Sequence, residues 1–410
     1  MIMQDNEKKP ALRFKGFTDP WEQRKLEEYL KVSGQKNFEG IYTKEDVLSV
    51  SGDFGIVNQI EFQGRSFAGA SVANYGVVET GDIVYTKSPL KSNPYGIIKA
   101  NKGKNGIVST LYAVYKPKQS ANPEFVQIYF EQDARMNNYM HPLVNKGAKN
   151  DMKVSAENAL KGQIVFPDIK EQRTISEFFR NLDTLITLHQ RKYEKLVNIK
   201  KSMLNKMFPQ NGASVPEIRF KDFTDPWEQR KISELAEKTY GGGTPTPSNE
   251  TFWNGNIPWI QSSDIVDGKL MGVEPRKYIT QTGLNSSATQ LVPKNSIAII
   301  TRVGVGKLAY MPFSYSTSQD FLSLSKLNTE PFFTVYACYK KLQSELNTVQ
   351  GTSIKGITKD ELLAKTISVP VYSEQKQIGS FFAQLDTLIT LHQREHIKSI
   401  LEVKRVKRNE

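Results

Sequence analysis

The sequence of 410 residues is poor in the side chains that usually build a covalent frame or a metal centre. It contains one cysteine, Cys338, and four histidines. A single cysteine excludes a disulfide framework and a multi-cysteine metal site, and it is typical of a protein in a reducing cytoplasm. No apolar run approaches the roughly 18 residues that a membrane-spanning helix requires, and the polar start MIMQDNEKKP does not fit a signal peptide. We therefore expect a cytoplasmic protein with no membrane association.

The sequence also lacks the patterns that would indicate an enzyme. Residues 304–307 (GVGK) have neither the upstream glycine nor the following Ser or Thr of a phosphate-binding loop, and 241–243 (GGG) lead into Thr-Pro instead of a helix. Residues 93–95 (NPY) share positions with the Asn-Pro-Pro-Tyr loop of amino-methyltransferases, but no glycine-rich cofactor loop accompanies them, so we interpret them as a turn. His189 and His392 are interpreted as polar contacts on helices rather than as metal ligands. These absences predict a chain that binds without catalysing, with no cofactor and no metal.

Acidic residues are fewer than basic residues in this sequence. Lys and Arg number 55 against 43 Asp and Glu, which gives a formal net charge of +12 and a sequence pI of about 9.3. Such a balance favours a polyanionic partner, either nucleic acid or a membrane surface, over an acidic small molecule. We favour nucleic acid; the alternative is a solvated basic surface without a polyanionic partner.

Two segments of the sequence occur twice. Residues 13–25 (RFKGFTDPWEQRK) and 219–231 (RFKDFTDPWEQRK) differ at one position, and 178–191 (FFRNLDTLITLHQR) and 381–394 (FFAQLDTLITLHQR) differ at two. The two offsets nearly agree, so the chain is two tandem copies of one unit of about 205 residues. The inserts between the repeated segments barely match each other. We infer one scaffold that presents two different recognition surfaces.

Each copy is expected to form strands that are followed by one long helix. The β-branched and aromatic runs that predict strands are 81–85, 106–115 and 296–301. At the end of each insert, 154–172 aligns with 357–375, and both predict a short helix followed by a strand, QIVF or TISV. Thr358 and Glu361 have the spacing of a capping box, and Ser155 stands at the equivalent N-cap position.

The long helix is predicted from Glu171 to about Met207, where no Gly or Pro occurs. Its apolar residues recur every 3.5 positions, with polar interruptions. The expected seam residues are Ile175, Phe178, Leu182 and Leu185 in the first copy and Ile378, Phe381, Leu385 and Leu388 in the second. We expect the two sister helices to bury these stripes against each other; the alternative is that each helix folds back on its own domain.

The order of these parts resembles the specificity subunit of type I restriction–modification systems, over essentially the whole chain. The resemblance rests on 241–265 (GGGTPTPSNETFWNGNIPWIQSSDI), on 81–99 (GDIVYTKSPLKSNPYGIIK) and on the repeated LDTLITLHQR. It implies a non-catalytic reader of double-stranded DNA of the α/β class. Two tandem target recognition domains would each read one half of a split site. Two long helices would form an antiparallel coiled coil with pseudo-twofold symmetry and set the gap. Two methyltransferase subunits would dock on this scaffold, and restriction and translocation subunits would join them.

The resemblance and the repeat together predict the domain boundaries. Target recognition domain 1 is expected at 1–168 and target recognition domain 2 at 219–370. A central spacer helix is expected at 169–208, a linker at 209–218, where Pro, Gly and Asn are frequent, and a distal helix at 371–410.

Candidate contact residues follow from side-chain chemistry. Lys and Arg neutralise phosphates, and Arg, Asn and Gln form paired hydrogen bonds with base edges. The DNA-binding candidates are Lys87, Ser88, Lys91, Asn93, Lys99, Lys102 and Lys104 in the first domain and Thr244, Ser262, Arg302, Lys307 and Gln319 in the second. Off-seam positions that are identical in both helices suggest partner contacts, and these are Asp183, Thr187, Gln190, Arg191, Asp386, Thr390, Gln393 and Arg394.

Two functions from other classes remain open at this stage. One is an adaptor that joins two partners through its helices and never touches DNA. The other is a fused restriction–methylation enzyme, against which the missing catalytic motifs argue. A steep loss of binding with rising salt would distinguish a DNA reader from the adaptor.

Overall fold

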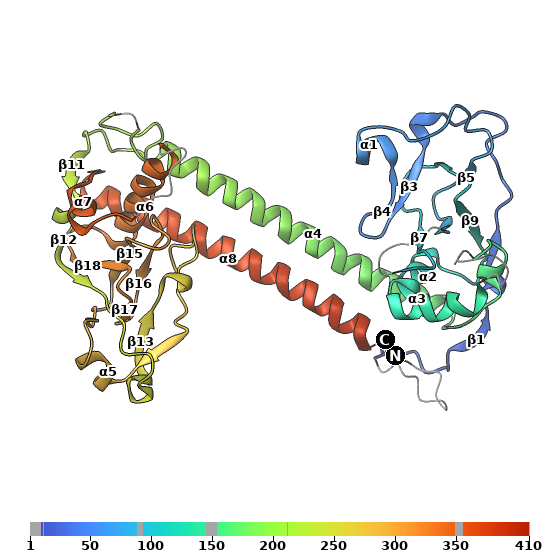
Figure 1. Ribbon diagram of the computed structural model, residues 1–410. Coiled ribbons are helices and arrows are strands. Elements are labelled where there is room, and N and C mark those ends of the chain that lie inside the picture. The colour runs from blue at the N-terminus through green and yellow to red at the C-terminus, as the bar shows by residue number, and fades with distance from the viewer. Residues whose placement is uncertain are drawn as a thin grey trace. The chain divides into compact units, whose positions relative to one another are not determined.

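The structure is a computed structural model that describes residues 10, 12–87, 93–144, 154–210, 212–348 and 356–409. It divides into two compact units (Figure 1). The first comprises Met1–Thr187 with Ile397–Glu410, and the second comprises Leu188–His396. Helices and mainly antiparallel sheets occur in both units, in keeping with the predicted mixed fold and the predicted internal repeat.

The first unit is built around a four-stranded antiparallel sheet in the order β2-β9-β6-β7. Its strands are β2 (Leu30–Val32), β9 (Tyr112–Pro117), β6 (Ile83–Thr86) and β7 (Ile98–Ala100). Two ladders accompany the sheet, β3 (Leu48–Ser51) with β4 (Gly55–Asn58) and β5 (Gly76–Val78) with β8 (Gly106–Val108). The helices are α1 (Gln59–Gln63), α2 (Pro123–Phe130), which lies against β7, and α3 (Asp133–Met140). The predicted strand 106–115 is therefore two strands, β8 and β9, separated by a turn.

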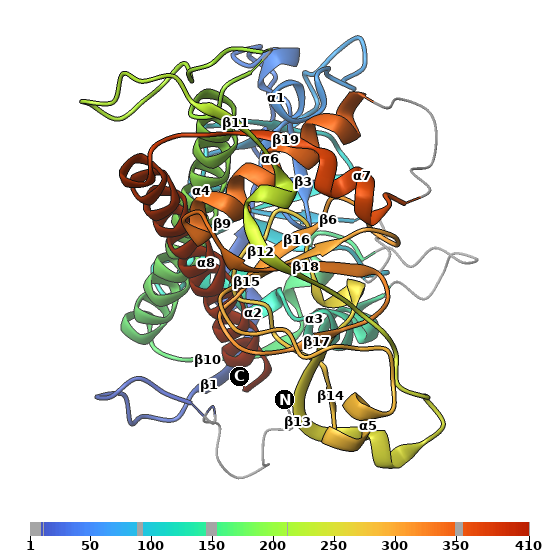
Figure 2. The same cartoon turned by 90° about the vertical axis from the view of Figure 1, so that its left-hand side faces the viewer.

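The second unit has a different arrangement of strands. A four-stranded antiparallel sheet contains β12 (Ala236–Gly241), β18 (Phe321–Leu327), β15 (Ser296–Ile300) and β16 (Leu308–Met311), in that order. A second sheet contains β14 (Lys277–Ile279), β13 (Trp253–Ile260) and β17 (Ser316–Thr317), and here β13 and β17 run parallel. Helix α6 (Pro331–Thr348) packs against β15 and β16. Helix α5 (Gln281–Asn285) lies against β13 and β14 (Figure 2), and α7 (Lys359–Ala364) follows α6 in the chain.

The repeated opening block is explained by its contacts within each unit. Its strand β1 (Glu22–Lys25) pairs with β10 (Gln163–Phe166), and β11 (Glu228–Lys231) pairs in the same register with β19 (Thr366–Val369). In the first unit, Arg13 donates from Nε and Nη2 to the carboxylate of Glu171, at 2.8 and 2.7 Å. The tryptophans of the two blocks, Trp21 and Trp227, are buried in the cores of their own units. Packing and ion pairing are thus sufficient reasons for the repeat of this block.

Two long helices, α4 (Ile169–Lys206) and α8 (Tyr372–Asn409), confirm the predicted pair, and each has 38 residues. Within the second unit they run antiparallel, because His189 meets His392 while Lys200, further along α4, meets Asp386, earlier in α8. Within the first unit, Val403 of α8 packs on the core that contains Ile175 of α4.

The burial of the predicted seam residues differs along the helices. Ile175, Leu182 and Leu385 are buried, and Ile175 lies in the core of its own unit together with Trp21, as the alternative of a helix folded on its own domain expects. Leu185 and Leu388, which were expected in the seam, are 44% and 43% exposed. The 3.5-residue repeat assigns both leucines to the apolar stripe of their helix. The buried face of each helix is narrower than this stripe, so both leucines remain exposed.

Local signals at the end of each insert behave as predicted, with one difference. Thr358 accepts a hydrogen bond from the backbone N of Glu361, and the reciprocal bond completes the capping box of α7. Ser155 accepts from the backbone N of Asn158, but the element that follows is a single 3-10 turn instead of a helix. Both predicted strands, β10 and β19, are present. Within the described part of the chain, no helix combines the length and apolar character needed to span a membrane.

Candidate nucleic-acid interface and partner surfaces

Several predicted DNA contacts of the second unit meet at one edge of its smaller sheet. Because β13 and β17 are parallel, with Ile260 opposite Thr317, both strands end on the same side. Ser262 follows the end of β13 by two residues, and Gln319 follows the end of β17 by two. The backbone N of Ser318 donates to the carbonyl of Ile260 at 2.9 Å, which holds these two strand ends together.

A glycine run brings a third predicted residue to this edge. The backbone N of Gly243 donates to the carbonyl of Thr317 at 2.9 Å. A Cβ on Gly242 would lie 1.9 Å from the carbonyl oxygen of Ser318, so only glycine permits this approach. Thr244, next in the chain, then donates from its hydroxyl to Oε1 of Gln319 at 2.6 Å. The predicted contacts Thr244 and Gln319 are therefore direct neighbours.

The loop between β15 and β16 supplies the positive charge. The backbone N of Thr301 donates to the carbonyl of Asp320 at 2.7 Å, which places Arg302 beside the turn that carries Gln319. Arg302 is exposed and Lys307 is half-buried. The backbone N of Ile300 donates to the carbonyl of Lys307 at 2.9 Å and closes the loop. We call this surface the strand-end edge. It consists of four exposed or half-buried side chains from separate elements, Thr244, Ser262, Arg302 and Gln319.

In the first unit, the exposed basic candidates are Lys102 and Lys104, on the turn between β7 and β8. The turn is held by buried Asn101, whose side-chain amide donates to the carbonyls of Glu79 and Lys104 at 3.1 and 3.0 Å. Thr80 adds a bond from its hydroxyl to the carbonyl of Gly103 at 2.6 Å. The turn is thus ordered, and both ammonium groups can reach phosphates in solvent.

Other candidates of the first unit serve its own structure. Lys99 is 8% exposed, and its ammonium lies 3.3 Å from a carboxylate oxygen of Glu131. Asn93 is buried and donates to Asp133 at 2.8 Å. Burial lowers the pKa of Lys87, whose ammonium donates to the carbonyl of Thr110 at 3.1 Å. Ser88 and Lys91 lie outside the described residues.

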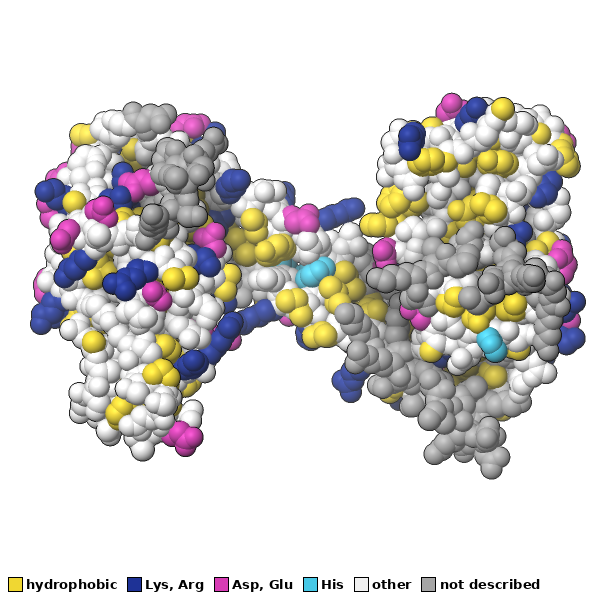
Figure 3. All heavy atoms as spheres, viewed as in Figure 1, with side chains coloured by type: hydrophobic (Ala, Val, Ile, Leu, Met, Phe, Trp, Pro, Cys, Tyr) yellow, Lys and Arg dark blue, Asp and Glu magenta, His cyan; other side chains and the backbone are white. Residues whose placement is uncertain are grey.

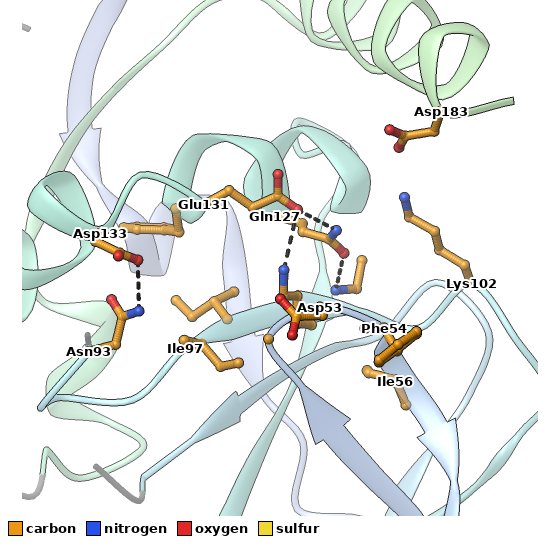
Figure 4. Close-up of a pocket in the computed structure, with 16 residues that line it drawn as sticks. Asp53, Phe54, Ile56, Asn93, Ile97, Lys102, Gln127, Glu131, Asp133 and Asp183 are labelled. Atoms are coloured by element: carbon orange, nitrogen blue, oxygen red, sulfur yellow. Dashed lines mark hydrogen bonds and ion pairs between the residues drawn. The ribbon is translucent and has the colours of Figure 1, made fainter. Parts of the chain in front are cut away.

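A groove of about 670 Å³ lies in the first unit between the β3–β4 hairpin, β7, α2 and α4 (Figure 4). Sequence reasoning did not identify it, because its lining comes from four separate stretches of the chain. Four carboxylates line it, from Asp53, Glu131, Asp133 and Asp183, against the ammonium groups of Lys99 and Lys102. This acidic excess is unfavourable for a phosphate backbone, so we do not place DNA in the groove.

Repeated residues of the two helices differ in their surroundings. Asp386 accepts from the ammonium of Lys200 at 2.5 Å and from the hydroxyl of Tyr336 at 2.6 Å, and it is largely buried. Its repeat equivalent, Asp183, is exposed at the edge of the groove. Asp386 thus has a role inside its own unit, and we leave it out of the partner surface.

The other predicted partner residues are divided between helix contacts and free surface. Thr187 and Thr390 donate from their hydroxyls to the carbonyls of Asp183 and Asp386, one turn earlier in each helix. Gln190 donates to Glu194 at 2.6 Å. The arginines Arg191 and Arg394 are exposed, as is Gln393.

Sequence reasoning missed an apolar surface on the same helices. The repeat-equivalent leucines of LDTLITLHQR are exposed in both copies, with Leu185 and Leu188 both at 44%, Leu388 at 43% and Leu391 at 50%. Hydrophobic side chains are visible on the surface of the helical segment in Figure 3. A cluster of exposed leucines at identical places in both copies favours a protein contact, and the identical sequence was the signal that could have found them.

Two copies of one frame hold two unlike inserts, and comparisons with known proteins show what this chain is similar to. Residues 224–402 match the family model described as the type I restriction modification DNA specificity domain. The EcoR124I/EcoR124II type I restriction enzyme specificity subunit of Escherichia coli is 28% identical over 263 residues, covering 61% of this chain and 62% of that protein. The MjaIX specificity subunit of Methanocaldococcus jannaschii is 27% identical over 170 residues, covering 40% of this chain and 38% of that protein.

A solved structure shares the fold. The type I restriction–modification system S subunit from M. genitalium matches with a TM-score of 0.59 over 98% of both chains, at 11% identity. The chain spans 62% of the length of the E. coli relative that it matches. The chain is thus similar to specificity subunits of type I restriction enzymes over part of its length, and residues 224–402 carry the domain match.

Proposed function

We propose that this chain is the DNA sequence-specificity subunit of a type I restriction–modification complex, without catalytic activity of its own. Its two recognition domains, 1–168 and 219–370, would each read one half of a bipartite site on double-stranded DNA. The helices at 169–208 and 371–410, with the linker 209–218, would join them. Acting on DNA inside the cell would place it in the cytoplasm.

One observation carries this proposal. A duplicated frame holds two unlike inserts, and in the second insert Arg302 lies beside the turn that carries Gln319. Arg302 and Gln319 are the side chains that form paired hydrogen bonds with guanine and adenine edges. Thr244 and Ser262 would add contacts to bases or phosphates. Lys307 in the second domain, and Lys102 and Lys104 in the first, are proposed as phosphate contacts.

Replacing Arg302 by alanine should weaken binding to the cognate DNA by about 1–3 kcal/mol and relax selectivity at one base position. The reason is that a guanine edge would lose two charge-assisted hydrogen bonds. Titration of the chain, assembled with its methyltransferase partner, against cognate duplexes with single base changes measures both effects.

The control for this variant is Arg230→Ala, which removes another exposed arginine of the same unit. Arg230 lies in β11 and forms an exposed ion pair with Glu228. It should leave affinity and selectivity unchanged. Cognate affinity and selectivity that stay normal in Arg302→Ala would remove the strand-end edge from the interface.

The partners proposed for the helices are two methyltransferase subunits, one for each repeated LDTLITLHQR surface, with restriction and translocation subunits joining them. Two equivalent surfaces on one chain favour two copies of one partner about a pseudo-twofold axis. Leu185, Leu188, Leu388 and Leu391 would provide the apolar centre of each surface, and Arg191, Gln393 and Arg394 the polar rim.

Changing Leu185 and Leu388 together to aspartate should abolish assembly with the methyltransferase. Each substitution would place a charge at the centre of an apolar contact, while an exposed position tolerates it in the unassembled chain. Analytical ultracentrifugation of the mixed subunits measures the stoichiometry, and each single variant should lose one of two bound methyltransferases.

The matched control is Leu291→Asp, because Leu291 is 46% exposed but lies off the helices. It should assemble normally. A Leu185→Asp, Leu388→Asp double variant that still bound two methyltransferases would show that the repeated leucines are not the partner surface.

A further inference from the structure

Two histidines face each other across the long helices of the second unit. His189 lies on α4 and His392 on α8, and their Nδ1 atoms are 3.1 Å apart. The ring centroids are 5.3 Å apart, with an angle of 41° between the ring planes. Both side chains are partly exposed, and histidine atoms are visible on the surface of the helical segment in Figure 3. The pair is therefore open to an ion from solvent.

The separation of the two nitrogens suits a shared metal ion. Zn²⁺ binds imidazole nitrogen at about 2.0–2.1 Å, so two nitrogens on one ion lie roughly 2.9–3.4 Å apart for bond angles near 90–110°. The observed 3.1 Å falls in this interval. The distance between the two nitrogens is thus compatible with one shared ion.

We propose that His189 and His392 together bind one divalent transition-metal ion of the Zn²⁺ type, with water completing its coordination. Imidazole ligands select Zn²⁺, Cu²⁺ or Ni²⁺ over Mg²⁺ and Ca²⁺. In the described residues no group of three or more His, Cys, Asp or Glu is arranged to hold a metal, so the site has two protein ligands. An ion bound by one residue from each helix fixes the register of α4 against α8. This site would replace the plain polar contact inferred from the sequence.

The test uses the full chain, free of any histidine tag and dialysed against a chelator, with ZnCl₂ as the probe. Isothermal titration should give one ion per chain, and Zn²⁺ but not Mg²⁺ should raise the melting temperature, since a ligand that binds only the folded state stabilises it. His189→Gln and His392→Gln should each weaken Zn²⁺ binding by about tenfold or more and remove the thermal shift. Glutamine keeps a polar side chain at the helix contact, so the variants should fold.

Two histidines outside the pair serve as controls. His141 is exposed in the first unit, and His396 lies one turn beyond His392 with an interaction of its own. His141→Gln and His396→Gln should bind Zn²⁺ like the unaltered chain. Absence of binding to the unaltered chain, full binding in His189→Gln, or loss in His396→Gln with His189→Gln unaffected would each overturn the proposal.

Discussion

Replacing Arg219 by alanine is expected to lower the free energy of unfolding of the second unit by about 3–5 kcal/mol. Arg219 donates from Nε and Nη2 to both carboxylate oxygens of Glu374, at 2.7 and 2.8 Å. The side chain of Glu374 is fully buried, and that of Arg219 is 14% exposed. The alanine variant leaves a buried carboxylate without its counter-charge, which is the costly way to break such a pair. Urea unfolding followed by circular dichroism measures the effect.

Two further variants test whether the cost comes from the unpaired buried carboxylate of Glu374 or from the loss of any arginine. Arg230→Ala removes an ion pair whose side chains are 40% and 70% exposed, and it should cost no more than about 1 kcal/mol. The double variant Arg219→Met, Glu374→Leu replaces the pair by apolar side chains and should be far more stable than Arg219→Ala. A cost below about 1 kcal/mol for Arg219→Ala would contradict a structural role for the repeated opening block.

Exchanging residues 26–162 for the equivalent segment of another specificity subunit should change one half of the recognised DNA site and leave the other half intact. Lys25 and Gln163 are paired in the β1–β10 ladder, so the exchanged segment begins and ends at one place in the frame. The Arg13–Glu171 ion pair lies outside the exchanged segment and is kept. Mapping the methylated positions in DNA from cells that carry the complex gives the half-sites.

The reciprocal exchange is the matched control. Residues 232–365 lie between the paired residues Lys231 and Thr366 of the β11–β19 ladder. Replacing them should change the other half-site only. If either exchange altered both halves, or neither half, the two inserts would not be independent readers.

The frame of this protein could be predicted from sequence because its signals are local or repeated. The duplicated block, the absence of Gly and Pro from Glu171 to Met207, and the Thr358–Glu361 capping box each depend on residues close together in the chain. The structure contains the corresponding elements, the two 38-residue helices and the cap of α7.

The candidate site was harder to predict because exposure depends on distant parts of the chain. Lys99 has the same chemistry as Lys102, but Glu131, from beyond α2, pairs with Lys99 and buries it. The neighbourhood of Thr244 and Gln319 depends on the parallel pairing of β13 with β17, which no periodicity indicates. Leu185 fits a seam by its spacing, and only the packing of the helices leaves it in solvent.

The central claim is that one chain reads two separate half-sites, and selection from random duplex DNA tests it most directly. The chain, assembled with its methyltransferase partner, would be incubated with a pool of randomised duplexes, and the retained DNA sequenced. We predict two short specified blocks, separated by a gap of fixed length and unspecified sequence, with the Arg302→Ala variant losing selectivity in one block only. Enrichment of one continuous block, or no enrichment above the starting pool, would contradict the account.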